Sequence, residues 1–242
     1  MPVDLEDLAA GYEHRPPSGA ALRRAQRAAE SVGLGPGTVA VDIGGGPGHH
    51  AAVWAAQGGY AIVVDPSRRM TSVAHRHPGV HPICGVAQRL PLRHETVQLA
   101  YFHLSIHYGD WMRALDEVYR VLCPGGTCWI WTMGEDHLRS SFLARWFPSV
   151  GDIDAARFPD PGAIVGVLAE VWSEVEHGKE VEARQTSAAD WRAAAQARFV
   201  STLQLVPETE FATGLAAFDV AYPDPEQRVE YRLTFDWIRV RK

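Results

Sequence analysis

The chain is poor in lysine, poor in cysteine and carries no excess of positive charge. Only two of its 23 basic residues are lysines, and 29 acidic residues give it a formal net charge of −6. Nucleic acids and anionic membrane surfaces bind proteins through basic patches, so we expect neither as a partner. No apolar run is long enough to cross a bilayer, so we expect no membrane insertion.

The few cysteines are not arranged as a disulfide framework or a metal site. Cys84, Cys123 and Cys128 are an odd number, and no second Cys or His pair has the spacing that a zinc site built on Cys123 and Cys128 needs. The first twenty residues carry four acidic side chains and no apolar stretch, so we expect no secretory signal. The prediction is free thiols in or near the core of a cytoplasmic protein.

The chain contains enough apolar sequence for one domain, 1–242, with a buried core, because 46% of its 242 residues are hydrophobic. From residue 19 onward, helical patterns alternate with short apolar runs rich in β-branched residues. This alternation predicts an α/β fold with a doubly wound, mainly parallel sheet. The expected helices are 19–32, 50–57, 68–74 and 110–122, and the expected strands are 39–43, 60–64, 81–84, 98–102 and 127–133.

The last hundred residues are less regular. They predict a helix over 160–171 and strands over 172–176 and 229–240. The segments 134–158 and 184–226 exceed what simple crossovers need, and we expect them to be helical lid segments added to the domain. Their aromatic side chains fit either an apolar lid over a ligand or anchors for extra helices, namely Trp146, Phe147, Phe158, Trp191 and Phe199.

A Gly-rich loop gives the strongest functional signal. Gly44, Gly46 and Gly48 directly follow the expected strand 39–43 and precede a helix, the context in which such a loop lets the backbone approach a ligand closely. A dinucleotide site expects its third glycine one position later, where the chain has His49. The spacing therefore disfavours a ligand with a pyrophosphate. The remaining interpretations are a ligand without phosphates and a tight turn that binds no ligand.

Asp65 ends the second expected strand 21 residues after Gly44. In an open α/β sheet this position places a carboxylate beside a bound ribose, whose two hydroxyl groups need an acceptor. The alternative role is a helix N-cap, because Pro66 follows at a plausible first helical position.

Four motifs in order resemble the class I methyltransferases that depend on S-adenosylmethionine (SAM). They are Val41-Asp42-Ile43-Gly44-Gly45-Gly46-Pro47-Gly48, then Val64-Asp65-Pro66-Ser67, then Leu90-Pro91-Leu92, then Glu117-x-x-Arg120-Val121-Leu122-x-Pro124-Gly125-Gly126. The resemblance covers roughly residues 12–133. It is closest to the group that contains the ubiquinone and menaquinone C-methyltransferases and many natural-product methyltransferases.

The resemblance implies a Rossmann-like sheet of seven strands whose last strand is antiparallel. It also implies that Asp42 and the loop glycines line the methionine half of SAM, that Asp65 takes the ribose with Pro66 beside it, and that Tyr12 and Arg15 close over the site.

Two positions depart from the family pattern. Val86 stands where the family usually has an acid that accepts from the adenine amino group, and a valine cannot accept. Gln88 or a backbone carbonyl is the expected substitute. Gln98 replaces the Asp that usually opens the fourth strand.

The methyl group of SAM is activated by its own sulfonium, so a general base is needed only when the acceptor still carries its proton. His107 and His103 follow the fourth expected strand at the edge where such sheets bind ligands, and they are the candidate bases. A hydrogen-bonded structural role is the alternative for either. Their i, i+4 spacing also suggests a metal, but no third ligand completes such a site, and we expect none.

The predicted function is SAM-dependent methyl transfer to a small-molecule acceptor, with the acceptor atom undetermined. One alternative is a protein of the same fold that binds SAM and catalyses another reaction or none. An NAD-dependent oxidoreductase is the other, and the glycine spacing disfavours it. A homo-oligomer is compatible with the sequence, which does not determine the oligomeric state.

Overall fold

The structure is a computed structural model that describes residues 3–12 and 17–242. The chain divides into two compact units. Unit 1 consists of Met1–Arg15, Met133–Phe158 and Lys179–Phe235, and unit 2 consists of Pro16–Thr132, Pro159–Gly178 and Asp236–Lys242.

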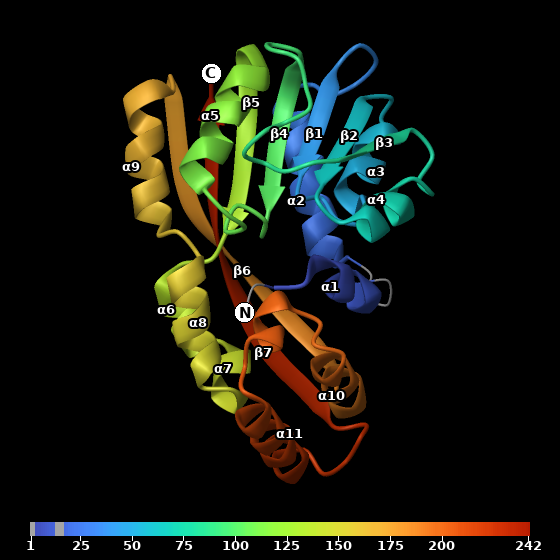
Figure 1. The fold of residues 1–242 in the computed structure, drawn as a ribbon, viewed down its shortest axis with the longest axis vertical. Coiled ribbons are helices and arrows are strands. Elements are labelled where there is room, and N and C mark those ends of the chain that lie inside the picture. The colour runs from blue at the N-terminus through green and yellow to red at the C-terminus, as the bar shows by residue number, and fades with distance from the viewer. Residues whose placement is uncertain (1–2, 13–16) are drawn as a thin grey trace. The chain divides into compact units, whose positions relative to one another are not determined.

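The described residues form a sheet of seven strands in the order β3-β2-β1-β4-β5-β7-β6 (Figure 1). Neighbours among the first five strands are parallel, and β7 is antiparallel to β5. This arrangement confirms the predicted fold class, including the antiparallel last strand. The strands are β1 Val39–Ile43, β2 Tyr60–Asp65, β3 Val80–Cys84, β4 Val97–His103, β5 Leu122–Thr132, β6 Glu174–Ser187 and β7 Arg228–Arg241.

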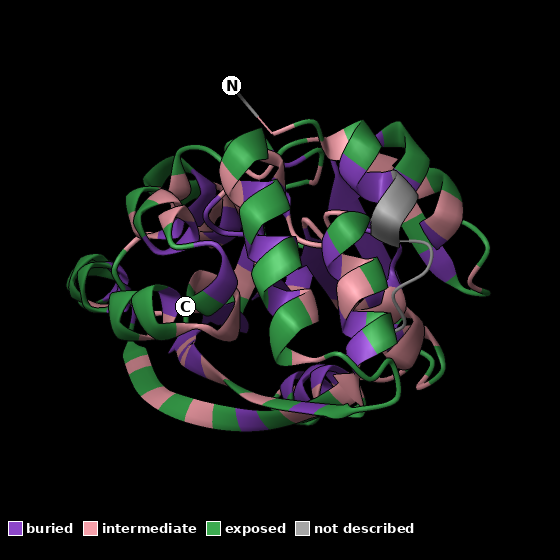
Figure 2. Ribbon diagram, turned by 90° about the horizontal axis from the view of Figure 1, so that it is seen from below, coloured by how far each residue is buried: buried purple, intermediate pink, exposed green. Residues whose placement is uncertain are grey.

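Helices cover both faces of the sheet in unit 2. The helices α5 Trp111–Val121 and α9 Pro161–Val171 pack on one face, where they share a core with alternate residues of β1, β2, β4 and β5. The helices α2 Gly19–Glu30, α3 His49–Ala55 and α4 Arg68–Ala74 contact the strands outside that core. Figure 2 shows the exposed and buried stripes of the helices. Apolar cover on both faces explains why the central strands are continuous apolar runs.

Three expected boundaries in unit 2 were wrong. Helix α5 ends at Val121, and β5 already begins at Leu122, so Pro124-Gly125-Gly126 lies within a strand whose register with β4 shifts near Val97. Trp172 ends α9 rather than opening a strand. Strand β6 starts at Glu174 and continues to Ser187, well beyond the predicted end. Local periodicity does not reveal this long strand, because most of its residues are at least half exposed or polar.

The described part of unit 1 is mainly helical, as expected for both added segments, although residues 184–187 continue β6. Ser187 caps α10 through its hydroxyl group, which accepts from the amide of Asp190 at 3.0 Å. None of the helices in the described chain is both long and apolar enough to cross a membrane. The helices of this unit are α1 Leu5–Tyr12, α6 Glu135–Ser140, α7 Phe142–Trp146, α8 Ser149–Arg157, α10 Ala188–Gln196, the 3₁₀ helix η1 Ser201–Gln204 and α11 Glu208–Ala221.

Aromatic side chains make the interior of unit 1. Trp146, Phe147 and Trp191 are each at most 8% exposed and belong to one apolar cluster. The ring of Trp191 stacks on that of Phe218 with 4.1 Å between centroids. Phe199 is half-buried against the same cluster. These rings therefore anchor the helices of unit 1 to one another, which favours the anchor role over an exposed apolar lid.

The three cysteines, all free thiols, differ in burial. Cys128 lies in the core on β5, and its burial raises the pKa of the thiol well above the usual range. Cys123 is half-buried. Cys84 is exposed, which corrects the expectation that all three thiols lie in or near the core.

Because the thiolate is the reactive form, Cys84 should be alkylated by iodoacetamide at pH 7.5 while Cys128 stays unmodified in the folded protein. Intact-protein and peptide mass spectrometry measure the modification of each site. The Cys84→Ser variant should lose the fast modification, and all three sites should react in urea. Equal alkylation rates for Cys84 and Cys128 in the native protein would contradict the burial of Cys128.

Candidate functional site

The Gly-rich loop at the carboxyl end of β1 adopts a backbone conformation that favours glycine. Gly44, Gly46 and Gly48 have φ angles of 68°, 53° and 81°. A Cβ atom on Gly44 would lie 2.5 Å from the Cβ of Ser105, and one on Gly48 would lie 2.9 Å from the Cβ of Ala74. Side chains are thus excluded at Gly44 and Gly48 by close packing as well as by backbone strain.

Gly46 differs from the other two glycines because protein atoms do not crowd it. The nearest atom to a Cβ placed there is the sulfur of Met70, at 3.7 Å. Gly46 is nonetheless buried, so protein atoms surround it at ordinary contact distances. The loop lies at the carboxyl edge of a doubly wound sheet, where ligands approach in folds of this kind.

The carboxylate of Asp65 joins this loop to the turn after β2. One oxygen accepts a hydrogen bond from the amide of Gly46 and the other accepts from the amide of Ser67, both at 2.9 Å. The residue is 7% exposed. Each carboxylate oxygen can accept more than one hydrogen bond, so these contacts leave acceptor capacity for a ligand.

The structure rules out the helix-cap role for Asp65. Helix α4 begins at Arg68, and its N-cap is Ser67, whose hydroxyl oxygen accepts from the amide of Met70 at 3.1 Å. Pro66 therefore precedes the cap and is not the first helical residue.

Asp42 lies deep beneath the loop and is 1% exposed. The Nδ1 atom of His50 lies 3.1 Å from its Oδ2 atom. A Cβ on Gly45 would come within 2.5 Å of the same carboxylate, so the loop closes tightly over it. Sequence reasoning did not single out His50. The available signal was its position two residues after the last glycine of the loop.

His103 is the last residue of β4 and lies near His50, with 4.8 Å between ring centroids. Its Nε2 atom lies 3.5 Å from the guanidinium of Arg24 on α2. Arg24 is 2% exposed, and its guanidinium stacks over the ring of Trp131 at 4.8 Å. Arg24 is thus buried on α2, whereas Arg23 beside it is exposed. The stem and the planar group of an arginine pack well against aromatic rings.

His107 lies in the loop between β4 and α5 and is 9% exposed, with its ring 4.2 Å from that of Tyr108. The start of this loop is held in place by Ser105, whose hydroxyl donates to the carbonyl of Ile43 at 2.6 Å. Leu104 has a φ angle of 55°, a strained conformation for a leucine. Strain of this kind costs on the order of 1–3 kcal/mol and is common near functional sites.

Val86 and Gln98, which replace acidic residues of the family pattern, lie in different parts of the fold, and so does Gln88, the expected substitute for the first acid. Val86 is 46% exposed. The side-chain amide of Gln88 donates to the carbonyl of Tyr108 at 3.0 Å, which leaves its own oxygen as an acceptor. Gln98 accepts from the amide of Val39 at 2.7 Å at the amino ends of β1 and β4, away from the Gly-rich loop. Gln98 therefore replaces the Asp at a position that connects two strands, and this change does not alter the candidate site.

The remaining candidate residues lie partly outside what the structure describes. Tyr12 is the last residue of α1, and its side chain is not described, while Arg15 lies outside the described residues. Within residues 3–12 and 17–242, no group of three or more His, Cys, Asp and Glu side chains is placed to hold a metal ion.

His49, next to His50, faces a different neighbour. Its ring lies edge-on to that of His77 at 5.4 Å. Burial, followed by the proximity of His77 and His50, lowers the pKa of His49 from its ordinary value. His49 therefore tends to stay neutral.

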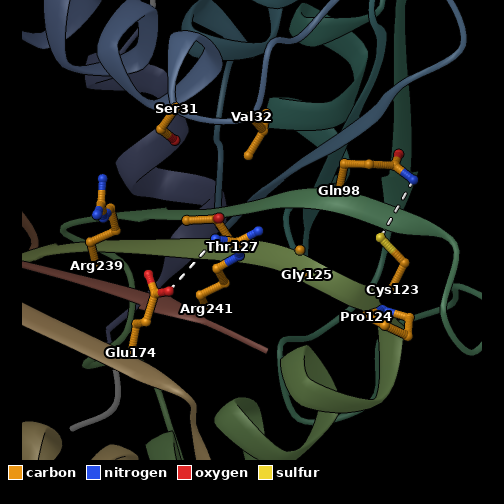
Figure 3. A pocket seen from close by; sticks show the side chains of 11 residues that line it. Ser31, Val32, Gln98, Cys123, Pro124, Gly125, Thr127, Glu174, Arg239 and Arg241 are labelled. Carbon is orange, nitrogen blue, oxygen red and sulfur yellow. Dashed lines mark hydrogen bonds and ion pairs between the residues drawn. The ribbon is translucent and has the colours of Figure 1, made fainter.

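A cavity of about 380 Å³ lies at the opposite edge of the sheet, at the amino ends of β4 and β5 (Figure 3). Gln98, Cys123 and Thr127 line it together with Arg241, whose guanidinium lies 3.6 Å from Glu174. It does not include any residue of the Gly-rich loop. We therefore place the candidate site at the carboxyl edge, where the loop, Asp42 and Asp65 converge.

Comparison with known proteins identifies the same segment. Residues 41–130 match the family model described as a methyltransferase domain. The chain is 31% identical over 112 residues to malonyl-[acyl-carrier protein] O-methyltransferase of Pectobacterium atrosepticum, covering 46% of this chain and 44% of that protein. It is 39% identical over 89 residues to the ubiquinone/menaquinone biosynthesis C-methyltransferase UbiE of Rubrivivax gelatinosus, covering 36% of each. The matches thus span less than half the length of these relatives.

Solved structures resemble a larger part of the chain. A putative methyltransferase from an antibiotic biosynthesis pathway of Anabaena variabilis is 24% identical, with a TM-score of 0.71 over 90% of this chain and 96% of that chain. Phosphoethanolamine N-methyltransferase 2 of Haemonchus contortus, solved with S-adenosyl-L-methionine, is 16% identical, with a TM-score of 0.61 over 98% of this chain and 56% of that one. At these identities the likeness shows the fold.

The sheet order, the Gly-rich loop with Asp65 beside it, and the match over residues 41–130 agree with one another. They confirm the resemblance that the sequence motifs indicate. Residues 41–130 thus match a methyltransferase domain, and the chain is similar in sequence motifs and fold to the class I SAM-dependent methyltransferases.

Proposed function

We propose that this protein binds SAM at the Gly-rich loop and transfers its methyl group to a small-molecule acceptor. The observation that carries the proposal is the loop itself: its glycines have left-handed φ angles at the carboxyl end of β1, and the amide of Gly46 is joined by a hydrogen bond to the carboxylate of Asp65. A ligand with a ribose and no phosphates fits this pair of features, because Pro47 provides no amide donor for a pyrophosphate.

In this proposal each part of SAM has its own partners. Asp65, with Pro66 beside it, takes the ribose hydroxyl groups, and Asp42, Gly44, Gly46 and Gly48 line the methionine half. The Oε1 atom of Gln88 remains an acceptor for the adenine amino group, since the amide nitrogen of Gln88 is engaged with Tyr108. Tyr12 and Arg15 contribute to closing the site.

The sulfonium of SAM supplies an activated methyl group, so the protein has to align the acceptor and exclude water. We propose His107 as the base for an acceptor that carries a proton, with His103 as the second candidate. The contact between Arg24 and Nε2 of His103 favours His107 over His103 as the base. Arginine can only donate, so that nitrogen of His103 already serves as an acceptor.

The acceptor is proposed to be a small molecule, without a choice of atom. The names of the two relatives refer to methylation at oxygen and at carbon. We propose that the segments 134–158 and 184–226 of the single domain act as lids in acceptor binding, because they exceed the crossovers that the sheet needs; their buried aromatic rings serve as anchors inside unit 1 and are not the lid surface. The free thiols support a cytoplasmic protein. We also propose that the protein has no nucleic-acid partner, because its net charge is negative. A homo-oligomer is a further proposal.

A second candidate is a protein that binds SAM without transferring the methyl group. Val86, exposed where the family has an acid, supports it. Incubating the protein with methyl-labelled SAM and a panel of phenols, amines and carboxylic acids separates the two. Labelled product supports methyl transfer, whereas SAM binding with no labelled product across the panel supports the second candidate.

Asp65→Ala should weaken SAM binding about ten- to hundredfold, or roughly 1.5–3 kcal/mol, the contribution of hydrogen bonds to a charged group. Isothermal titration calorimetry measures the affinity. Ser67→Ala is the matched control, since it removes the cap of α4 next to Asp65 and leaves the carboxylate in place. It should lower stability by about 1 kcal/mol and keep SAM affinity. Unchanged affinity in a folded Asp65→Ala protein would remove Asp65 from the site.

Gly46→Val should abolish SAM binding, because a branched side chain would have to fit at a buried position of the loop and would strain a backbone with a φ angle of 53°. Gly37→Val is the control for strain alone. Gly37 has a φ angle of 85° and no neighbouring atom within 4 Å. Calorimetry on both soluble variants should show binding only for Gly37→Val, and retained binding by Gly46→Val would contradict the loop assignment.

For a hydroxyl or protonated amine acceptor, His107→Ala should lower turnover by roughly 10²–10⁴ and leave SAM affinity nearly unchanged, the usual effect of losing a general base. Turnover and SAM affinity measured against pH test this. His94→Ala, at an exposed histidine, is the control and should behave as the wild type. A stable His107→Ala protein with the wild-type rate and pH profile would exclude the general-base role.

A further inference from the structure

His50, which contacts the carboxylate of Asp42, has no role in the proposed function described so far. Among the described residues, His50 is the polar partner of the Asp42 carboxylate, through the 3.1 Å contact with Oδ2. Asp42 is 1% exposed, and the loop lies so close to it that position 45 must be glycine. The number of groups that can reach this carboxylate is therefore small.

The geometry defines which nitrogen of His50 carries a proton. A carboxylate only accepts hydrogen bonds, so Nδ1 of His50 donates to Asp42. Nε2 is then protonated only in the cationic form of the ring. The side chain of His50 is 13% exposed, so exchange of this proton with solvent is possible.

Several charged or titratable groups surround His50. Asp42 on β1 faces Nδ1, and the rings of Tyr101 and His103 on β4 lie 5.3 Å and 4.8 Å from the His50 ring. The guanidinium of Arg24 on α2 lies beside His103. His49 precedes it on the same helix. Asp42 is thus the negative charge facing a group of basic side chains in the described part of the site.

A bound SAM would add a further positive group here. By the proposed function, the methionine half of SAM lies along Asp42, and its α-ammonium group can only donate hydrogen bonds. A cationic His50 and this ammonium group would then compete for one desolvated carboxylate. Like charges brought together in a poorly solvated site disfavour each other, so one of the two has to lose its charge or its contact.

We propose that His50 is a cofactor-site residue that holds the Asp42 carboxylate when the site is empty and releases its Nε2 proton when SAM binds. The proton passes to solvent, and neutral His50 keeps its Nδ1 contact while the ammonium group takes the second acceptor position on Asp42. This inference rests on the proposed function. It makes SAM affinity depend on pH through one identified side chain.

Calorimetry of SAM binding at pH 5.5, in two buffers with different ionisation enthalpies, counts the protons released. The wild type should release a proton on binding SAM at pH 5.5, and release of one proton per SAM corresponds to a loss of affinity of about tenfold for each unit by which the pH falls. S-adenosylhomocysteine keeps the ammonium group and lacks the sulfonium charge, so it should give the same proton count. Loss of the release with this ligand would overturn the role of the ammonium group.

Two variants assign the proton to its source. His50→Asn places an amide nitrogen near the position of Nδ1, which can donate to Asp42 without titrating, so the release should disappear and the affinity should no longer depend on pH. His49→Asn is the matched control, because His49 faces His77 and should leave the release intact. Circular dichroism verifies that both variants are folded.

The possible outcomes separate this inference from the proposed function. A wild-type protein that binds SAM at pH 7.5 and releases no proton at pH 5.5 overturns the inference and leaves the proposed function standing, and this result needs no variant. Release that persists in His50→Asn also overturns it. Failure of SAM to bind the wild type at pH 7.5 overturns the proposed function, and the inference falls with it.

Discussion

Two hydrogen bonds to the carboxylate of Asp65 hold the site together. They connect the amide of Gly46, in the loop after β1, with the amide of Ser67, in the turn after β2. The ladder between β1 and β2 and the hydrogen bond from the amide of Gly44 to the carbonyl of Val64 at 2.7 Å set the spacing of the two strand ends, and the Asp65 carboxylate extends this link to Gly46. The same carboxylate is the expected ribose acceptor, which ties the ligand contact to the geometry of the loop.

The close packing around the loop makes that geometry rigid. Ser105 fills the space beside Gly44 and bonds to Ile43, and the Asp42 carboxylate fills the space beside Gly45. Gly46 is buried as well, and a Cβ there would lie 3.7 Å from the sulfur of Met70, an ordinary contact. Close packing of this kind restricts the loop backbone to one conformation.

Much of this could be read from the sequence because the signals are local. Buried parallel strands appear as apolar runs, and the glycines and Asp65 appear at their ends, so the fold and the loop were predicted. The signals for β6 and Arg24 are not local. The long exposed strand depends on pairing with β7, and burial of Arg24 depends on the ring of Trp131, more than a hundred residues away. His50 was missed because the imidazole gains significance only through its contact with Asp42.

A crystal structure of the protein with S-adenosylhomocysteine tests the central claim most directly. The ribose hydroxyl oxygens should lie within hydrogen-bond distance of the Asp65 carboxylate. The amino group of the ligand should lie within reach of Asp42, and its homocysteine part should lie along Gly46. A nucleoside bound elsewhere, for example in the cavity at the opposite edge of the sheet, would contradict it.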